Sequence, residues 1–383
     1  MTRGATGVAE VAASDLALPA ELSRRRLRAR LLIATGVLLA VIAVVTLLPG
    51  LGELRSRLAH AKPGWLALGV GLKLLSGVGY VAVFRMVFCR RMSWRVSYQI
   101  GMSELGANAL FPTGGAGGLA LGAWALRRGG MAAREIARRS VAFFLLTSIP
   151  NVVGVIVVGL ALAVGLLSGE RNLLLTAAPA AVAAAAIAVT LLAGRIAARG
   201  EDRQSRSSLV RVSRRARALR ASLTALADGV QEALVLLREA NLVLILGLLG
   251  YLVFDLMILW ATFRAIGPAP ALGVLVMGYL IGELGGLIPI PGGIGGIDAG
   301  LVGTLVLYHV TLTSAAGAVL AYRTIAIWVP AIVGSGAFVA LRRTLRGEAN
   351  AIAVCAPQTE IEIIGVGRAV IRADDRAAAS AEG

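Results

Sequence analysis

The stretch GELGGLIPIPGGIGGIDAG, residues 282–300, places a glutamate, two prolines and several paired glycines inside a very hydrophobic chain. Proline removes a backbone donor and glycine lets the backbone turn, so we expect one helix to end here and another to begin. Non-helical backbone at membrane depth is tolerated only where protein or a wet cavity covers it. The stretch therefore predicts a broken helix inside a membrane bundle.

The composition of the whole chain indicates an integral membrane protein. Hydrophobic residues make up 57% of the 383 residues, charged residues only 15%, and the mean hydropathy is +0.81, values far from those of soluble domains. The net charge of +17 comes from arginines between the apolar runs, where they would meet anionic lipid headgroups. We therefore expect membrane lipids as partners and no nucleic acid.

Cysteine and histidine are scarce. Cys89, Cys355, His60 and His309 are the whole set, which is too few for a disulfide framework or a Cys/His zinc site. The sequence also contains no Walker-type phosphate loop, so we expect neither a metal, nor another cofactor, nor ATP hydrolysis.

Six apolar runs are long enough to cross a bilayer as helices, and two more are interrupted near their middles. The interrupted regions, 96–126 and 271–308, contain FPTGGAGG (111–118) and IPIPGGIGG (288–296). We expect each to form two half-helices that enter and leave the membrane on one side; complete crossing is the alternative. The six full runs lie at about 31–49, 64–84, 140–167, 172–194, 241–263 and 312–341.

Basic clusters orient these runs. RRRLRAR (24–30) precedes the first run and RRTLR (342–346) follows the last. Because cytoplasmic loops carry the excess of Lys and Arg, both termini are predicted to lie in the cytoplasm, in a multi-pass protein of the cell membrane. The basic segment 1–30 and the tail 346–383 then flank a transmembrane domain at 31–345.

The sequence contains an internal repeat. SELGANALFPTGGAGG (103–118) aligns with GELGGLIPIPGGIGG (282–296), and IPNVVG (149–154) aligns with VPAIVG (329–334), at offsets of 179 and 180 positions. One unit covers about 62–154 and the other about 241–334; in the predicted topology they start on opposite sides, so the repeat is inverted. The predicted fold is an all-α polytopic membrane protein with about six full transmembrane helices plus two broken re-entrant helix pairs in an inverted repeat, an architecture typical of alternating-access transporters.

Several ionisable residues lie within the apolar runs, where each costs at least about 2.5 kcal/mol and is usually paired or functional. Glu104 and Glu283 occupy matching positions just before the two breaks. Arg323 matches Phe143, and an unmatched buried arginine is a candidate for phosphate recognition. The full set is Lys73, Glu104, Asp255, Glu283, Asp298 and Arg323.

Each of these residues also has a purely structural interpretation. Asp298 would complement the dipole of the half-helix that it opens. Glu104 and Glu283 would form structural ion pairs with Lys73 or Arg323. The breaks themselves would be kinks that serve packing. Lys73 and Asp255 are the candidates for ion coupling.

Two blocks resemble a known family: NALFPTGGAGGLALGAWALRRGGMAAREIARRSV (108–141) and IPIPGGIGGIDAGLVGTLVLYHVTLTSAAGAVLAYRTIAIWVPAIVG (288–334). They look like the signature blocks of the lysylphosphatidylglycerol synthase transmembrane-region family, also described as flippase-like. The resemblance covers roughly 30–345 and implies a protein that handles a phospholipid or an isoprenoid-linked lipid. The family pattern falls on Asn108, Pro112, Gly114, Gly115, Glu283, Pro289, Pro291, Gly292, Gly293, Gly295, Arg323 and Pro330.

The chain departs from this family pattern in three ways. Asp298 stands where a glutamate is usual, and His309 stands where a glycine is common. Only residues 347–383 follow the last run, so the soluble aminoacyl-transferring domain of the two-part enzyme has no counterpart here. We therefore expect no lysyl transfer by this chain alone.

Residues 203–238 have apolar side chains three and four positions apart, with arginines around the first half, which predicts an amphipathic helix. We expect it to lie on anionic lipid at the cytoplasmic face, with docking against the bundle or a partner helix as the alternative. Residues 351–372 alternate weakly like a small hairpin.

Three functions fit the sequence. The favoured hypothesis is a lipid translocator, with the broken helices and Arg323 forming a substrate site between repeats that rock against each other. A membrane-embedded transferase on a lipid-linked substrate is the second. The third is an accessory subunit that binds lipid without moving it and serves a lipid-synthesising partner enzyme.

Overall fold

The computed structural model describes residues 35–36, 52–110, 116–167, 176–185, 227–239, 241–285, 296–347 and 355. Over these ranges the chain is helical and contains no strand, which confirms the predicted all-α polytopic class. Among the described residues, four helices are long and apolar enough to cross a membrane, and a short helix, α3 (Gly52–Ala59), precedes them. The four are α4 (Pro63–Phe88), α7 (Ala133–Ala163), α10 (Leu242–Ile266) and α13 (Leu312–Gly347). The predicted runs 31–49 and 172–194 lie mostly outside the described residues; within them, 176–185 is helical.

Both interrupted regions form two short helices, as predicted. The first region gives α5 (Trp94–Leu110) and α6 (Ala116–Arg128), and the second gives α11 (Leu272–Gly285) and α12 (Gly296–Leu307). The connecting residues, 111–115 and 286–295, lie outside the part of the chain that the structure describes.

The two helices of each broken pair pack side by side and antiparallel. In the second pair Gly278 packs against Leu305, and Gly282, one turn later, packs against Leu301, one turn earlier. The first pair has the same arrangement, because Asn108 lies over Gly118 and Glu104 over Gly122. Each broken region is therefore a helical hairpin.

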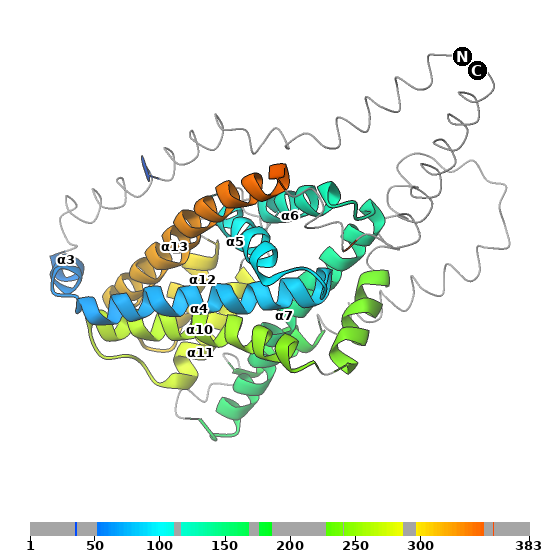
Figure 1. The fold of residues 1–383 in the computed structure, drawn as a ribbon. Coiled ribbons are helices and arrows are strands. Elements are labelled where there is room, and N and C mark those ends of the chain that lie inside the picture. Colours follow the sequence, from blue (N-terminus) through cyan, green and yellow to red (C-terminus); the bar gives the residue numbers. More distant parts are fainter. Residues whose placement is uncertain are drawn as a thin grey trace, which may run out of the picture.

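The first helices of the two repeats, α4 and α10, lie alongside each other in antiparallel directions (Figure 1). Gly79 contacts the backbone at Gly247, where a β-carbon on residue 79 would lie 2.8 Å from a carbonyl oxygen. At the other end of the crossing, Gly69 contacts Ile258. With the repeat offset of 179 positions, Gly79 of the first repeat matches Ile258 of the second, and Gly247 matches residue 68, next to Gly69. The Gly79–Gly247 contact therefore has a near-equivalent in the Gly69–Ile258 contact, with the roles of the two repeats reversed. A pseudo-two-fold axis between inverted units produces such a pair of contacts.

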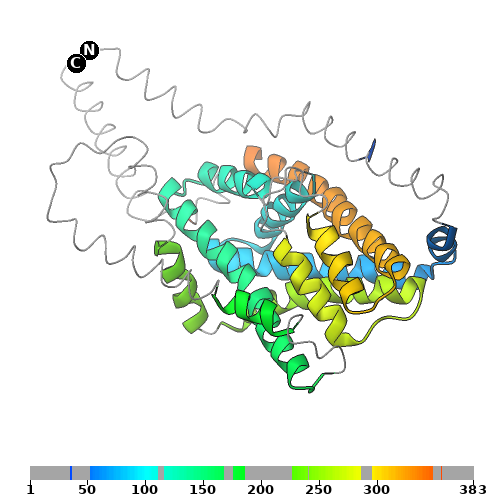
Figure 2. The same ribbon diagram turned by 180° about the vertical axis from the view of Figure 1, so that it is seen from behind.

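Each hairpin packs on the last helix of the opposite repeat. The α5–α6 hairpin lies against α13, where Gly106 meets Gly334 backbone to backbone. The α11–α12 hairpin lies against α7, where Leu280 meets Gly154. Gly154 and Gly334 match in the repeat. The two units are therefore interlocked, and the view from behind shows α11 and α12 between the long helices (Figure 2).

The second helix of each hairpin ends in the same way. After α6, Gly130 adopts a positive φ of 88°, and the Met131 amide donates to the Leu126 carbonyl. After α12, His309 adopts a positive φ of 62°, and the Val310 amide donates to the Leu305 carbonyl. This pattern is a Schellman cap, in which the left-handed position favours glycine. The matching positions of the two caps thus carry Gly130 in the first repeat and His309 in the second.

The described part of the predicted amphipathic helix, residues 227–239, docks on the bundle. Gly229 packs against Val141 of α7, and Asp228 and Glu232 form ion pairs with Arg134 (3.5 Å) and Arg138 (3.8 Å). The docking alternative is therefore correct for this part. The arginine-rich part, 203–226, lies outside the described residues. The buried side chains of the docked part are those of Ala227, Val230, Ala233 and Leu236.

A disulfide joins Cys89, at the end of α4, to Cys355. This bond could not be predicted from the sequence, because the cysteines are 266 positions apart and two cysteines give no spacing pattern. Arg139 of α7 donates to the carbonyl of Phe88 at the same end of α4. The bond ties residue 355 to this end of the bundle, whereas the rest of the predicted hairpin, 351–372, lies outside the described residues.

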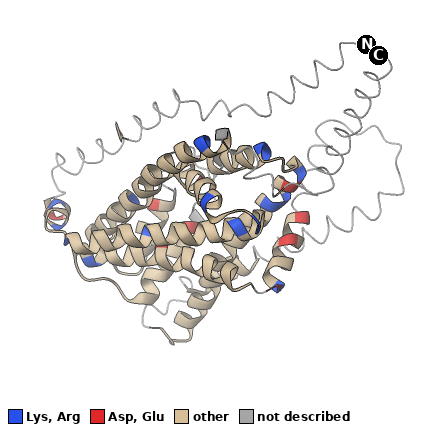
Figure 3. Ribbon diagram, in the orientation of Figure 1, with Lys and Arg blue, Asp and Glu red and all other residues tan. Residues whose placement is uncertain are grey.

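Charged residues concentrate near the helix ends and on the docked helix, and few lie along the middle of the bundle (Figure 3). The buried charged residues in the described part of the chain are Lys73, Glu104 and Asp255, all of which the sequence singled out.

Candidate functional site

A buried ion pair lies between the two repeats. The ammonium group of Lys73 on α4 lies 2.6 Å from Oδ1 of Asp255 on α10, and each residue is only 7% exposed. The hydroxyl of Ser76 donates to the same oxygen over 2.9 Å. The hydroxyls of Tyr279 on α11 and Tyr322 on α13 lie 3.4 Å from the other oxygen. Four helices from both repeats thus converge on one carboxylate.

These contacts decide one alternative that the sequence left open. Among the ion pairs of the described residues, Lys73 pairs with Asp255 and not with Glu104 or Glu283. A buried ion pair is stable only when further hydrogen bonds satisfy its remaining polar atoms, and the three hydroxyl groups do so here. Ser76 is the repeat match of Asp255, so the cluster lies close to the pseudo-two-fold axis.

The acid of the first hairpin, Glu104, lies in a closed aromatic pocket. The hydroxyl of Tyr80 donates to Oε2 of Glu104 over 3.0 Å, and the residue is 2% exposed. Phe143 packs edge-on against Tyr80 with ring centroids 5.1 Å apart. Gly122, on the second helix of the hairpin, leaves the space that the carboxylate fills. Within the described residues, Glu104 therefore pairs with a neutral phenol and with no cation.

The acid of the second hairpin, Glu283, lies in a highly charged neighbourhood. The carboxylate of Glu283 is close enough to Arg323, Asp255, Lys73 and Asp298 for all four charges to act on it. Arg323 forms an ion pair with Asp298, and their side chains are 22% and 31% exposed. Asp298 lies in the first turn of α12, as the helix-dipole interpretation requires. It therefore lies where it complements the dipole of the half-helix, and it also pairs with Arg323.

The two hairpins thus differ at matching positions. Where the first repeat has Phe143 packed on Tyr80, the second has Arg323, which is partly exposed and forms an ion pair with Asp298. A guanidinium offers five donors in a planar fork that suits phosphate oxygens. In the second site Arg323 is partly exposed and paired with Asp298, whereas in the first site the carboxylate of Glu104 fills the space above Gly122.

Asn108 connects the two helices of the first hairpin. Its Oδ1 accepts a hydrogen bond of 2.8 Å from the amide of Gly118, at the start of α6. This bond supports the architecture of the break, so the side-chain oxygen of Asn108 is already engaged. The other predicted residues of the breaks lie outside the described residues and keep their predicted roles; they are Pro112, Gly114, Gly115, Pro289, Pro291, Gly292, Gly293 and Gly295.

Sequence reasoning missed the hydroxyl groups of the site. Tyr279 lies four residues before Glu283, and Tyr322 immediately precedes Arg323. Side chains four apart share a helix face, so the spacing to Glu283 was a usable signal for Tyr279. Ser76 could have been found as the repeat match of Asp255.

The family profile described as Lysylphosphatidylglycerol synthase TM region matches residues 31–334. This chain belongs to that family. The match includes both hairpins, the four long helices up to Gly334 and the buried ion pair. It supports a multi-pass membrane protein related to lipid metabolism or lipid flipping. Among curated proteins, none matches this chain.

Proposed function

We propose that this protein translocates an anionic phospholipid or an isoprenoid-linked lipid across the cell membrane by alternating access. The observation that carries the proposal is the replacement of Phe143 by Arg323 at the matching position of the repeat. It places a partly exposed guanidinium on α13, where it pairs with Asp298 of the second hairpin and is within electrostatic reach of Glu283. The phosphate of a lipid headgroup is the ligand that such a cation suits best.

The arrangement of the repeats supplies a route for movement. Two interlocked units related by a pseudo-two-fold axis can exchange conformations, so that a site between them faces each side in turn. In this proposal the hairpins enter the membrane from opposite sides, and both termini lie in the cytoplasm. The Lys73–Asp255 pair lies where the units meet, which makes it the candidate for ion coupling.

A liposome assay tests the proposal. Purified protein is reconstituted with a phosphatidylglycerol that carries a fluorescent headgroup, and a quencher that cannot cross the membrane is added outside. In liposomes without protein, the quencher reaches only the outer-leaflet lipid and removes about half of the fluorescence. A translocator also makes the inner-leaflet lipid accessible, so the quenched fraction exceeds one half. Arg323→Ala is expected to remove the excess, and Arg342→Ala, at the far end of the same helix, is expected to leave it unchanged.

Other outcomes identify the alternatives. A lipid product of altered mass would indicate a transferase. Tight lipid binding with quenching equal to that of empty liposomes would indicate an accessory subunit. Full activity in Arg323→Ala would remove this residue from the site.

A further inference from the structure

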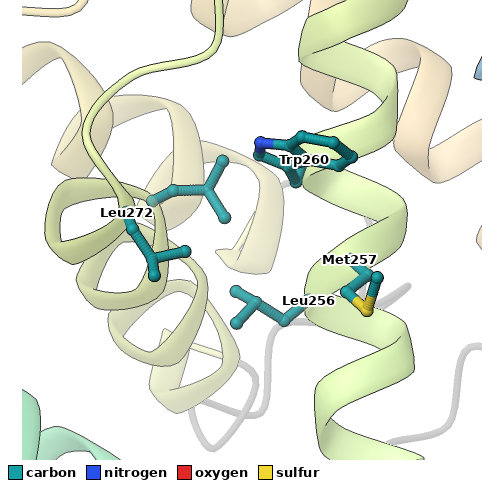
Figure 4. A pocket seen from close by; sticks show the side chains of 5 residues that line it. Leu256, Met257, Trp260 and Leu272 are labelled. Atoms are coloured by element: carbon teal, nitrogen blue, oxygen red, sulfur yellow. The ribbon is translucent and has the colours of Figure 1, made fainter.

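An apolar groove runs between α10 and α11 on the outside of the bundle (Figure 4). Its volume is about 220 Å³. Ligand pockets for compact small molecules usually measure about 300–1,000 Å³, so this groove suits a single chain better than a rounded ligand. Leu272, at one wall, is 62% exposed, which leaves the groove open to the surroundings. The lining residues are Leu256, Met257, Trp260, Leu272 and Leu275.

A cation lies at one end of the groove. Arg264, one turn beyond Trp260 on α10, stacks its guanidinium over the rings of Trp65 (5.6 Å) and Trp260 (5.8 Å). The two indoles pack edge-on with centroids 5.1 Å apart. Arg264 is exposed and lies in the last turn of its helix. Tryptophan and arginine at the end of an apolar helix are typical of the membrane interface, where headgroups begin.

We propose that this groove binds one acyl chain of an anionic phospholipid, with the lipid phosphate at Arg264. The apolar walls match a hydrocarbon chain, and the cation beside Trp260 matches the charge at the head of that chain. In the predicted orientation α10 ends at the outer face, so the lipid belongs to the outer leaflet. This site is separate from the Arg323 site and does not require that the protein translocate lipid.

Native mass spectrometry of the full chain in detergent tests the site. Delipidated protein is titrated with palmitoyl-oleoyl phosphatidylglycerol, with the matching phosphatidylcholine, and with soluble glycerol phosphate as separate probes. We expect phosphatidylglycerol to bind most tightly. Arg264→Gln is expected to weaken its binding roughly 10- to 100-fold, the loss typical of one charge-assisted contact. Leu272→Trp, which fills the groove from an exposed position, is expected to abolish binding of the lipid that binds most tightly.

Leu246→Trp is the matched control. This leucine is 59% exposed on the same helix, α10, and does not line the groove. Unchanged binding in Leu272→Trp, or an equal loss in Leu246→Trp, would overturn the groove assignment. Equal affinity for both lipids with no effect of Arg264→Gln would overturn the headgroup assignment. Glycerol phosphate that competes as strongly as the lipid would show an anion site without a role for the chain.

Discussion

The ammonium of Lys73 lies 2.6 Å from the carboxylate of Asp255, and this contact joins the first helices of the two repeats inside the bundle. Neither residue has a charged counterpart in the other repeat, because Lys73 matches Leu252 and Asp255 matches Ser76. The scaffold is symmetric, but its polar centre is not.

Removal of one partner of this pair leaves a buried charge. Lys73→Met is expected to lower the free energy of unfolding by about 3–5 kcal/mol, since the carboxylate of Asp255 loses its cation. Lys73→Met combined with Asp255→Leu is expected to recover much of that loss. Unfolding in mixed micelles, followed by tryptophan fluorescence, measures both. The single variant Asp255→Leu completes the comparison. If the decrease in the free energy of unfolding of the double variant equals the sum of the decreases in the two single variants, the two charges do not stabilise each other.

The carboxylate of Glu104 fills the space above Gly122. Gly122→Ala is expected to displace it from Tyr80 and to cost about 1–3 kcal/mol by overpacking. In the double variant Glu104→Ala with Gly122→Ala, the free energy of unfolding is expected to fall by less than the sum of the decreases in the two single variants. Gly336→Ala on α13 is the control, because a β-carbon there meets open space. Equal stabilities of the two glycine variants would contradict the packing described here.

The left-handed residue after α12 offers a test of the helix caps. His309→Gly is expected to raise the free energy of unfolding by roughly 1 kcal/mol, because the left-handed conformation costs a residue with a side chain about that much. Gly130→His, at the matching position, is expected to lower it by a similar amount. The same unfolding assay applies, and a destabilised His309→Gly protein would show that the imidazole makes contacts worth more than the strain.

The helices and both breaks could be predicted from the sequence, because apolar runs and Gly/Pro clusters are local signals. Helix lengths were less predictable. The apolar run of α7 was expected to start at about 140, but the helix begins at Ala133, because Arg134 and Arg138 continue it and pair with acids of the docked helix. Long basic side chains extend a membrane helix past its apolar run when their charges find partners.

The polar contacts could be predicted only in part. The matching positions of Glu104 and Glu283 were visible in the repeat, but which cation met which acid depended on how the helices cross. The Gly79–Gly247 crossing sets that register, and it brings Lys73 to Asp255. The hydroxyls of Tyr279 and Tyr322 were hidden among apolar residues, where a tyrosine is as compatible with packing as with hydrogen bonding.

The opposite orientation of the two repeats is the central claim, and Ala133 and Leu312 test it most directly. They are the first residues of the matched helices α7 and α13, and both are exposed. In a protein with Cys89 and Cys355 replaced by serine, each is changed to cysteine in turn and treated on intact cells with a maleimide that cannot cross the membrane. The inverted arrangement predicts that Leu312→Cys reacts at once and that Ala133→Cys reacts only after permeabilisation. Reaction of both from the same side would contradict it.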